Sequence, residues 1–226
     1  ASSLDSIGHL TKDVVDSALF LSVTAGQDSN DATSSKIKKE NYHLDLKELN
    51  LKKIRIGIPQ EYFIKGLDRE TRLLVEKAAK LLVKNGGEIK TISLPHTQYA
   101  VAVYYIVQPA EVSSNLARFD GYRYGANRLK FSPEAKRRIM LGTYTLSSGY
   151  YDAYYKKAMQ VRSLIKKDFD QAFKEVDIIL TPVSPSPAFK LGQKINNPLT
   201  MYLSDIFTVS VNLAGLPALA LPCGFN

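Results

Sequence analysis

Residues 54–59 read Ile54-Arg55-Ile56-Gly57-Ile58-Pro59, and this stretch decides the fold. Its isoleucines alternate with other residues, which predicts a β-strand, and Pro59 ends the strand because proline has no N–H to donate. Residues 68–84 place apolar side chains on one face at helical spacing, and a pair of glycines follows them. Residues 89–94 read as a second strand. A strand, a helix and a strand in succession predict an α/β layer with a right-handed crossover.

The rest of the chain extends this α/β pattern. Residues 100–115 predict a buried helix, and residues 152–176 predict the longest helix, with apolar side chains at helical spacing. Residues 176–182 are typical of an interior parallel strand, and residues 216–221 predict the last strand. The proline-rich loop 181–187 follows a strand end, where ligand sites of open α/β sheets lie, so it is a natural site wall.

The N-terminal part predicts one helix and one polar excursion. Thr11 is the predicted N-cap, apolar residues from Val14 to Val23 form a stripe, and Gly26 ends the helix. Residues 27–50 are rich in Ser, Asp, Asn and Lys, which indicates a segment at the surface.

The composition is that of a globular protein. The chain has 226 residues, of which 45% are hydrophobic and 23% charged. Its most apolar stretch, residues 211–222, contains two prolines and an asparagine, so a membrane-spanning helix is not predicted. The N-terminus shows no secretory signal. A single cysteine, Cys223, allows no internal disulfide, which favours a reducing, cytosol-like compartment.

The net charge of +8 does not by itself indicate a nucleic-acid site. The basic residues form four small clusters: Lys36, Lys38 and Lys39; Lys136 to Arg138; Lys156 and Lys157; Lys166 and Lys167. None shows the aromatic and glycine pattern of an RNA-recognition module, so solvated helix faces are the favoured interpretation.

Three parts of the sequence carry a family resemblance. They are the start Ser2-Ser3-Leu4-Asp5-Ser6-Ile7-Gly8; the block Lys136-Arg137-Arg138-Ile139-Met140-Leu141-Gly142-Thr143-Tyr144, continued through Ser147-Ser148-Gly149-Tyr150-Tyr151-Asp152-Ala153-Tyr154-Tyr155; and the final block, Met201 to Thr208, Val211 to Ala218 and Leu221 to Phe225. They resemble the amidase signature family, and within it the glutamine-hydrolysing subunits of tRNA-dependent amidotransferases. The resemblance covers nearly the whole chain.

The resemblance implies an amidase signature fold, an α/β fold whose mixed central sheet is covered by helices on both faces. Residues 1–226 would be the C-terminal portion of a single domain. The family's Ser-Ser-Lys catalytic set is expected upstream of residue 1, and no residue of this chain matches it. Residues 126–131 join two family blocks by fewer residues than the family has. This indicates either a deletion or a mobile loop left out of the sequence, and the second is favoured because loops near active sites are often mobile.

Three residues match family positions that recognise glutamine. The resemblance assigns Arg138 to the α-carboxylate, Asp205 to the α-ammonium, and Tyr104 to closing the pocket. A free amino acid needs a fixed cation and a fixed anion, which fits this set. The alternatives are that Arg138 is solvated beside Arg137, that Asp205 caps a helix, and that Tyr104 is a core residue.

The resemblance also implies an activity and partners. The chain would hydrolyse glutamine and send ammonia to a B subunit, where ATP and Mg²⁺ activate the Glu of mischarged Glu-tRNA(Gln). The B and C subunits would be its partners, with the tRNA held mainly by B. The compartment would be the bacterial cytoplasm or an organelle matrix. The alternatives are a stand-alone amidase of the same family and an incomplete chain that only docks to the B subunit.

Other reactive side chains carry weaker signals. Ser163 and Lys166 match a Ser-x-x-Lys pattern but lie within a predicted amphipathic helix. The three histidines, His9, His43 and His96, lack metal-ligand spacing, so no metal site is predicted. Tyr150, Tyr151, Tyr154 and Tyr155 form an aromatic cluster for which core packing is favoured over a seam or a contact with the B subunit.

Overall fold

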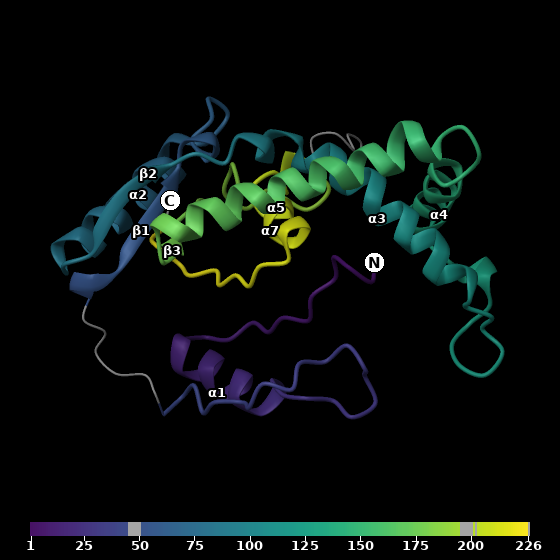
Figure 1. Ribbon diagram of the computed structural model, residues 1–226, viewed down its shortest axis with the longest axis horizontal. Helices are drawn as coiled ribbons and strands as arrows, with labels where there is room; N and C mark the ends of the chain where they lie inside the picture. Colours follow the sequence, from purple (N-terminus) through teal and green to yellow (C-terminus); the bar gives the residue numbers. More distant parts are fainter. Residues whose placement is uncertain (45–50, 195–200, 202, 226) are drawn as a thin grey trace. The chain divides into compact units, whose positions relative to one another are not determined.

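A computed structural model describes residues 1–44, 51–194, 201 and 203–225 (Figure 1). The chain forms two compact units: Ala1–Asp5 with Leu51–Asn226, and Ser6–Asn50. No helix within the described residues is long and apolar enough to cross a membrane.

The smaller unit contains helix α1 (Val14–Thr24). Its N-cap is Asp13, whose carboxylate accepts a hydrogen bond from the Asp16 amide at 2.8 Å. The prediction of Thr11 as the cap is therefore wrong. Asp13 directly precedes the first helical residue, so its side chain reaches the free amides of the first turn, whereas Thr11 donates to the Asp13 carbonyl oxygen at 2.9 Å. The helix ends at Thr24, and its C-cap is Ala25, the residue before Gly26.

The polar excursion after α1 has no helix or strand in its described part, residues 27–44. This segment contacts α1 at His43, whose Nδ1 lies 3.2 Å from the Ser22 hydroxyl. Residues 45–50 of this predicted excursion lie outside the described residues.

The larger unit is built on the predicted strand–helix–strand element, which is confirmed. Strand β1 (Arg55–Pro59) leads through α2 (Arg69–Lys84) to β2 (Glu88–Ile92), and the two strands pair in parallel. Asp68 caps α2 by accepting a 2.8 Å hydrogen bond from the Thr71 amide. The crossover therefore follows from local signals alone: an alternating run, a capped amphipathic helix and a second short strand.

The third strand, β3 (Ile178–Ile179), pairs in parallel with the other edge of β1 and gives the sheet order β2-β1-β3. It is shorter than the predicted 176–182, because only two residues lie opposite β1, and the flanking Asp177 and Leu180 amides donate to β1 carbonyl oxygens without extending the strand. The predicted strand over 216–221 does not form, because these residues pair with no strand in the described part of the chain. All described pairings are parallel, so the mixed character of the sheet stays a prediction.

The remaining helices of the larger unit pack mainly on one another. The α-helices are α3 (Ala100–Ala117), α4 (Pro133–Thr145), α5 (Lys157–Glu175) and α7 (Val209–Ala214); a π-helical turn, η5 (Tyr151–Lys156), leads into α5. The short 3₁₀ turns are η1 (Leu51–Lys53), η2 (Gln60–Tyr62), η3 (Pro95–Tyr99) and η4 (Arg128–Lys130). The predicted helices over 100–115 and 152–176 are confirmed, the second beginning with the π-helical turn.

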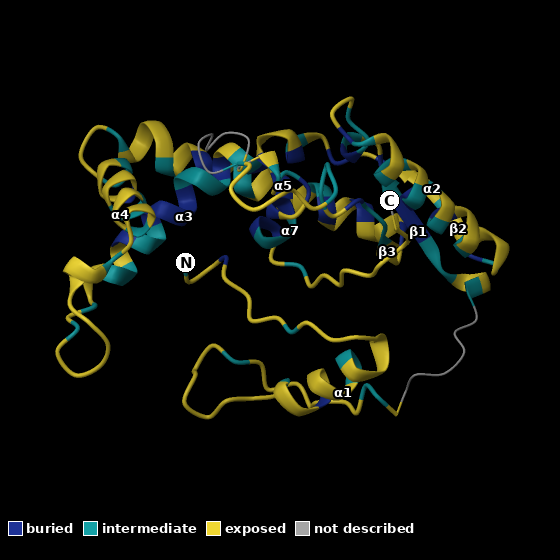
Figure 2. Cartoon of the chain, turned by 180° about the vertical axis from the view of Figure 1, so that it is seen from behind, coloured by how far each residue is buried: buried dark blue, intermediate teal, exposed yellow. Residues whose placement is uncertain are grey.

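The core of the larger unit lies where α3, α5 and α7 meet (Figure 2). Its best buried side chains include Leu94, Val107, Ile165 and Leu213, each at most 2% exposed. Burying such side chains stabilises the fold by roughly 1.5–3 kcal/mol each. Helix α4 packs on α3 at the edge of this core and remains mostly exposed.

Candidate functional site

The packing of α4 on α3 positions the first site residue, Arg138. Gly142 lies so close to α3 that a Cβ atom there would come within 1.8 Å of the Pro109 carbonyl oxygen. The absence of a side chain therefore brings the two backbones together. Ser132 caps α4 by accepting a hydrogen bond from the Ala135 amide at 3.2 Å, so the helix begins one and a half turns before Arg138.

Arg138 is largely shielded from water, with its side chain 25% exposed. Its Nε donates a 2.7 Å hydrogen bond to the Glu134 carboxylate, and its guanidinium carbon lies 5.9 Å from the centre of the Tyr105 ring. Burial disfavours its charge, but the hydrogen bond to Glu134 and an interaction with the Tyr104 side chain outweigh it, so the pKa of Arg138 is raised. The arginine is thus a fixed cation, and not a solvated one.

Glu134 holds two arginines at once. Its carboxylate accepts hydrogen bonds from Arg137 Nε at 2.8 Å and Nη2 at 2.7 Å, as well as the bond from Arg138. The hydrogen bonds from Arg137, and next those from Arg138, lower the pKa of Glu134 to about 2 against the effect of burial. Glu134 is therefore charged at neutral pH and orients Arg138.

Asp205 lies in the turn that precedes α7. Its backbone carbonyl oxygen accepts from the amides of Thr208 and Val209, both at 3.1 Å, which starts that helix. The N-cap of α7 is Thr208, so Asp205 does not act as its cap. Burial raises the pKa of Asp205, while the positive charges of Arg138 and Lys194 lower it in part. Arg138 and Asp205, far apart in sequence, therefore lie near each other.

Lys194 is a residue of this site that sequence reasoning missed. Its Nζ donates a 2.7 Å hydrogen bond to the hydroxyl of Ser204, next to Asp205, and lies 4.1 Å from the centre of the Phe189 ring. Its charge acts on Asp205 as well. The only signal in the sequence is a lone lysine upstream of the Met-Tyr-x-x-Asp block, which no motif singles out.

Tyr104 lies on α3 beside Arg138, as the resemblance expects. It is half-buried, packs against the core, and meets the neighbouring Tyr105 ring edge-on at 5.0 Å between ring centres. One end of the Tyr104 side chain packs against the core and the other interacts with Arg138, and its role in closing a pocket stays a prediction.

Arg138, Lys194, Asp205 and Tyr104 supply two cations, one carboxylate and one phenol, and the second carboxylate, Glu134, orients Arg138. Such a set can bind a small zwitterion, with a carboxylate held by arginine and an ammonium held by aspartate. Within the described part of the chain, no three His, Cys, Asp or Glu side chains are grouped as metal ligands.

The Ser-x-x-Lys pattern has a structural explanation. Ser163 donates to the Met159 carbonyl oxygen of its own helix at 3.1 Å, and Lys166 pairs with Asp170 at 2.9 Å on an exposed face. Neither side chain is available to activate the other, so this pair is not a nucleophile and its base.

Comparison with known proteins identifies the family. The sequence model described as Amidase matches residues 1–226. The chain belongs to the amidase family. The A subunit of Glutamyl-tRNA(Gln) amidotransferase from Thermodesulfovibrio yellowstonii is 55% identical over 240 residues, covering all of this chain and 49% of the relative. The A subunit from Syntrophus aciditrophicus is 52% identical, covering all of this chain and 50% of that protein. The chain therefore spans about half the length of the curated relatives that it matches.

Solved structures confirm the amidase signature fold. The A subunit of Glutamyl-tRNA(Gln) amidotransferase from Thermotoga maritima superposes with a TM-score of 0.76 at 41% identity, covering 95% of this chain and 45% of that one. A bacterial aryl acylamidase of the amidase signature family reaches 0.67 at 18% identity over 94% of this chain and 46% of the other, which shows the fold alone. The loop expected to be short or missing near 126–131 stays a prediction; those residues run continuously through η4.

Proposed function

We propose that this chain is the glutamine-recognising part of the glutaminase subunit of a tRNA-dependent amidotransferase. In this role it helps to release ammonia from glutamine for the conversion of Glu-tRNA(Gln) to Gln-tRNA(Gln) in the bacterial cytoplasm. The observation that carries the proposal is that the charge of a fixed cation, Arg138, acts on a partly buried carboxylate, Asp205, so that the two lie near each other without pairing. The names of the relatives support the same activity.

Each site residue has a distinct task in this proposal. Arg138 binds the α-carboxylate of glutamine, because its guanidinium can form two parallel hydrogen bonds. Asp205 binds the α-ammonium, and Tyr104 closes the pocket beside Arg138. Together they hold the backbone end of the substrate, so the side-chain amide points away from them toward the reacting groups.

The chemical step belongs to the Ser-Ser-Lys set that the family uses. A serine attacks the side-chain carboxamide, ammonia leaves, and water then hydrolyses the ester to glutamate. What this chain contributes is orientation, which supplies rate by holding the amide in reach of the nucleophile.

The partners follow from the same proposal. The B and C subunits complete the enzyme, the mischarged tRNA is held mainly by B, and ATP and Mg²⁺ act there to activate its glutamate. The charged residues of the candidate site suit a free amino acid and not a nucleoside triphosphate.

The second candidate is a stand-alone amidase of the same family. A simple amide has neither an α-carboxylate nor an α-ammonium. The opposite charges of Arg138 and Asp205 therefore favour glutamine as the substrate.

The test uses Arg138→Ala and Asp205→Ala in the complete glutaminase polypeptide, with Arg123→Ala on the exposed loop after α3 as the control. Each site variant is expected to raise KM for glutamine at least about tenfold, because it removes a charge-assisted hydrogen bond to the substrate. The hydrolysis of propionamide, which has neither charged group, should be unchanged. Equal losses on both substrates would support the stand-alone amidase. Unchanged kinetics in both variants would exclude this site.

The third alternative is an incomplete chain that only docks. Intact-mass measurement on the natural polypeptide separates it from the proposal. A mass far above that of 226 residues supports a complete glutaminase, and the glutamine assay then applies. A mass equal to that of 226 residues, together with no glutamine hydrolysis, supports a chain that only docks to the B subunit.

A further inference from the structure

Gln108, on α3, has a buried side-chain oxygen without a partner. The residue is only 7% exposed, and its Oε1 accepts no hydrogen bond from any residue that the structure describes. A buried acceptor that is left unpaired costs free energy, and most such groups in folded proteins have a donor. A bound ligand with an N–H group would supply the missing donor.

The position of Gln108 on α3 places it next to the candidate site. Gln108 follows Tyr104 by four residues, so the two side chains are neighbours on one face of the helix. Tyr104 interacts with the guanidinium group of Arg138. Gln108 therefore lies one helical turn, about 6 Å along the axis, from the residues that are proposed to hold the backbone end of glutamine.

The same face of α3 continues from Gln108 to Glu111, where protein groups occupy it. The Glu111 carboxylate accepts a 2.9 Å hydrogen bond from the Ser3 amide. Arg162 of α5 donates a 2.6 Å hydrogen bond to the Ser3 hydroxyl. In the row formed by Tyr104, Gln108 and Glu111, the first and last members thus have partners, and the middle one has an unpaired acceptor.

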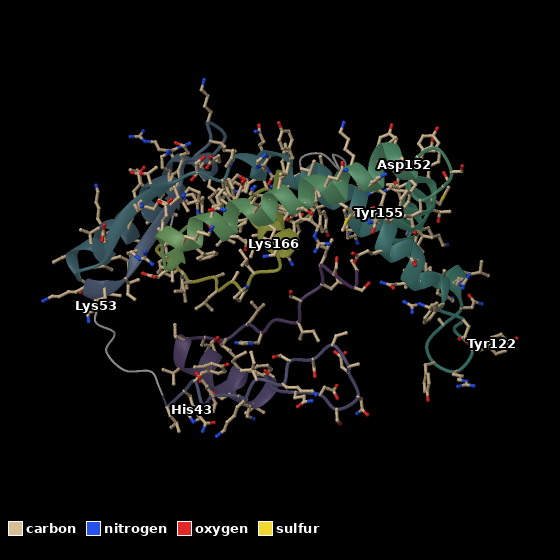
Figure 3. The ribbon with its side chains drawn as sticks, in the orientation of Figure 1. His43, Lys53, Tyr122, Asp152, Tyr155 and Lys166 are labelled. Carbon is tan, nitrogen blue, oxygen red and sulfur yellow. The ribbon has the colours of Figure 1, made fainter. Side chains whose placement is uncertain are left out.

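Tyr155 also borders the Glu111 end of this row. Figure 3 labels it at the start of α5, where η5 meets α3. Burial raises the pKa of Tyr155, and the charge of Glu111 adds to the rise. The prediction of core packing for the tyrosine cluster is wrong for Tyr151 and Tyr154, which are 44% and 50% exposed, whereas Tyr155 is half-buried. Protein side chains therefore close the row at Glu111 and leave the neighbourhood of Gln108 to a ligand.

The missing charge of this acceptor selects the ligand group. A neutral amide oxygen suits a neutral N–H group, whereas an ammonium is held better by a carboxylate such as Asp205. The carboxamide of glutamine has two N–H donors, and two methylene groups separate it from the α-carbon, a reach that matches the one-turn spacing from Tyr104 to Gln108. Arg138 and Lys194 carry donors only, so they cannot bind these N–H groups.

We infer that Gln108 Oε1 accepts a hydrogen bond from the side-chain carboxamide of bound glutamine, which makes Gln108 a specificity-determining residue. The inference rests on the proposed function, because it takes Arg138 and Asp205 as the residues that hold the backbone end. What it adds is recognition of the amide itself. An ionised γ-carboxylate or a γ-ester offers no N–H group and leaves Oε1 unpaired, so the site selects the amide over both.

The test compares Gln108→Met with Gln160→Met in the complete glutaminase polypeptide. Methionine roughly conserves the volume and removes the acceptor, and Gln160 is an exposed glutamine on α5 that serves as the matched control. Two quantities are measured: KM for glutamine, and Ki of L-glutamate γ-methyl ester as a competitor. Gln108→Met is expected to raise KM at least about fivefold and to change Ki less than about twofold. Gln160→Met should change neither.

Thermal unfolding without substrate separates this role from a structural one. Because Gln108→Met removes an unpaired buried acceptor, its Tm should equal or exceed that of wild type. A fall in Tm of more than about 5 °C would mean that another part of the complete polypeptide donates to Oε1, and would overturn the inference.

Two kinetic results would also overturn it. An unchanged KM for glutamine in Gln108→Met contradicts any contact with the substrate. Equal rises in KM and Ki would mean that Gln108 acts on a part that glutamine and the ester share, and not on the carboxamide.

Propionamide separates this inference from the proposed function, because it has the same carboxamide but neither charged group. If Gln108→Met raises KM for propionamide while Arg138→Ala leaves glutamine kinetics unchanged, the proposed function fails and amide recognition by Gln108 stands. If Arg138→Ala raises KM for glutamine and Gln108→Met does not, the inference fails alone.

Discussion

Lys194 Nζ donates a 2.7 Å hydrogen bond to Ser204 Oγ, which places a second cation beside Asp205. Burial raises the pKa of Asp205, and the charge of Lys194 opposes that rise. In the proposed site Asp205 must be ionised to bind the α-ammonium, so Lys194 is expected to keep the site usable toward lower pH. The lysine thus acts through Asp205.

Lys194→Met should therefore raise KM for glutamine mainly at low pH. Without the cation the pKa of Asp205 rises further, so a smaller fraction is ionised at pH 6 than at pH 8. We expect the increase in KM to be largest at the lowest pH at which the enzyme stays folded and to be smaller at pH 8, because the pKa of Asp205 is already raised by burial. Lys194→Arg should restore the wild-type profile. A KM ratio that does not vary with pH would contradict this role of the lysine.

Glu134→Gln should make the complete glutaminase polypeptide less stable at pH 7 but not near pH 2. The folded-state pKa of Glu134 is about 2, below its ordinary 4.5, so the pairing stabilises above pH 4.5 and is lost as pH falls toward 2. Because the carboxylate is half exposed, the loss at pH 7 should be only about 0.5–1 kcal/mol. Urea unfolding at both pH values checks this, with Glu76→Gln on α2 as the control. A loss of equal size at both pH values would show that the pairing is not its cause.

Gly142→Ala should destabilise the complete glutaminase polypeptide and weaken glutamine binding together. Alanine normally favours a helix over glycine by about 1 kcal/mol. Here the added methyl group would meet the Pro109 carbonyl, so α4 must move from α3, at a cost of about 1–3 kcal/mol or more. Arg138 lies one turn away on α4, so KM for glutamine should rise too. The control is Thr143→Ala, at the exposed neighbouring position, which should change neither Tm nor KM. A Gly142→Ala protein that is as stable as wild type would mean that α3 and α4 are not in this close contact.

The predictable part of the fold is the part encoded locally. The alternating run at 54–59 and the capped helix after Asp68 depend on neighbours in sequence, so β1, α2 and β2 form where expected. Residues 216–221 also have strand composition, but a strand needs a paired neighbour, which is a property of the tertiary fold. The sequence could not indicate whether that neighbour is present.

The candidate site also contains residues that the sequence indicated and residues that only the fold reveals. Arg138 and Asp205 were found through family blocks, and no local pattern alone would have joined residues so far apart. Lys194 lies in a polar loop without periodicity, so only the fold reveals it. The tyrosine cluster was visible, but its spacing fits a buried and an exposed helix face equally well, so the exposure of Tyr151 and Tyr154 could not be predicted.

The turn that carries Asp205 depends on a buried contact with Tyr62. The Tyr62 hydroxyl shares a hydrogen bond with Ser210, the first of these residues being 3% exposed and the second fully buried. The Tyr62 ring also stacks on Phe207 at 5.3 Å between ring centres, two residues after Asp205. The hydroxyl therefore contributes stability, whereas the ring positions the turn, and the two contributions can be separated.

Tyr62→Phe should lower the free energy of unfolding of the complete glutaminase polypeptide by about 1–2 kcal/mol, because Ser210 loses its buried partner, yet leave KM for glutamine within about twofold. Burial raises the pKa of Tyr62, so the hydroxyl stays protonated and the loss should be constant from pH 6 to 9. In a double-mutant cycle with Ser210→Ala, the coupling energy should be about 1 kcal/mol. Tyr62→Ala, which also removes the ring, should raise KM severalfold, since Phe207 loses the surface that fixes the turn. If Tyr62→Phe raises KM as much as Tyr62→Ala does, the hydroxyl and not the ring positions Asp205.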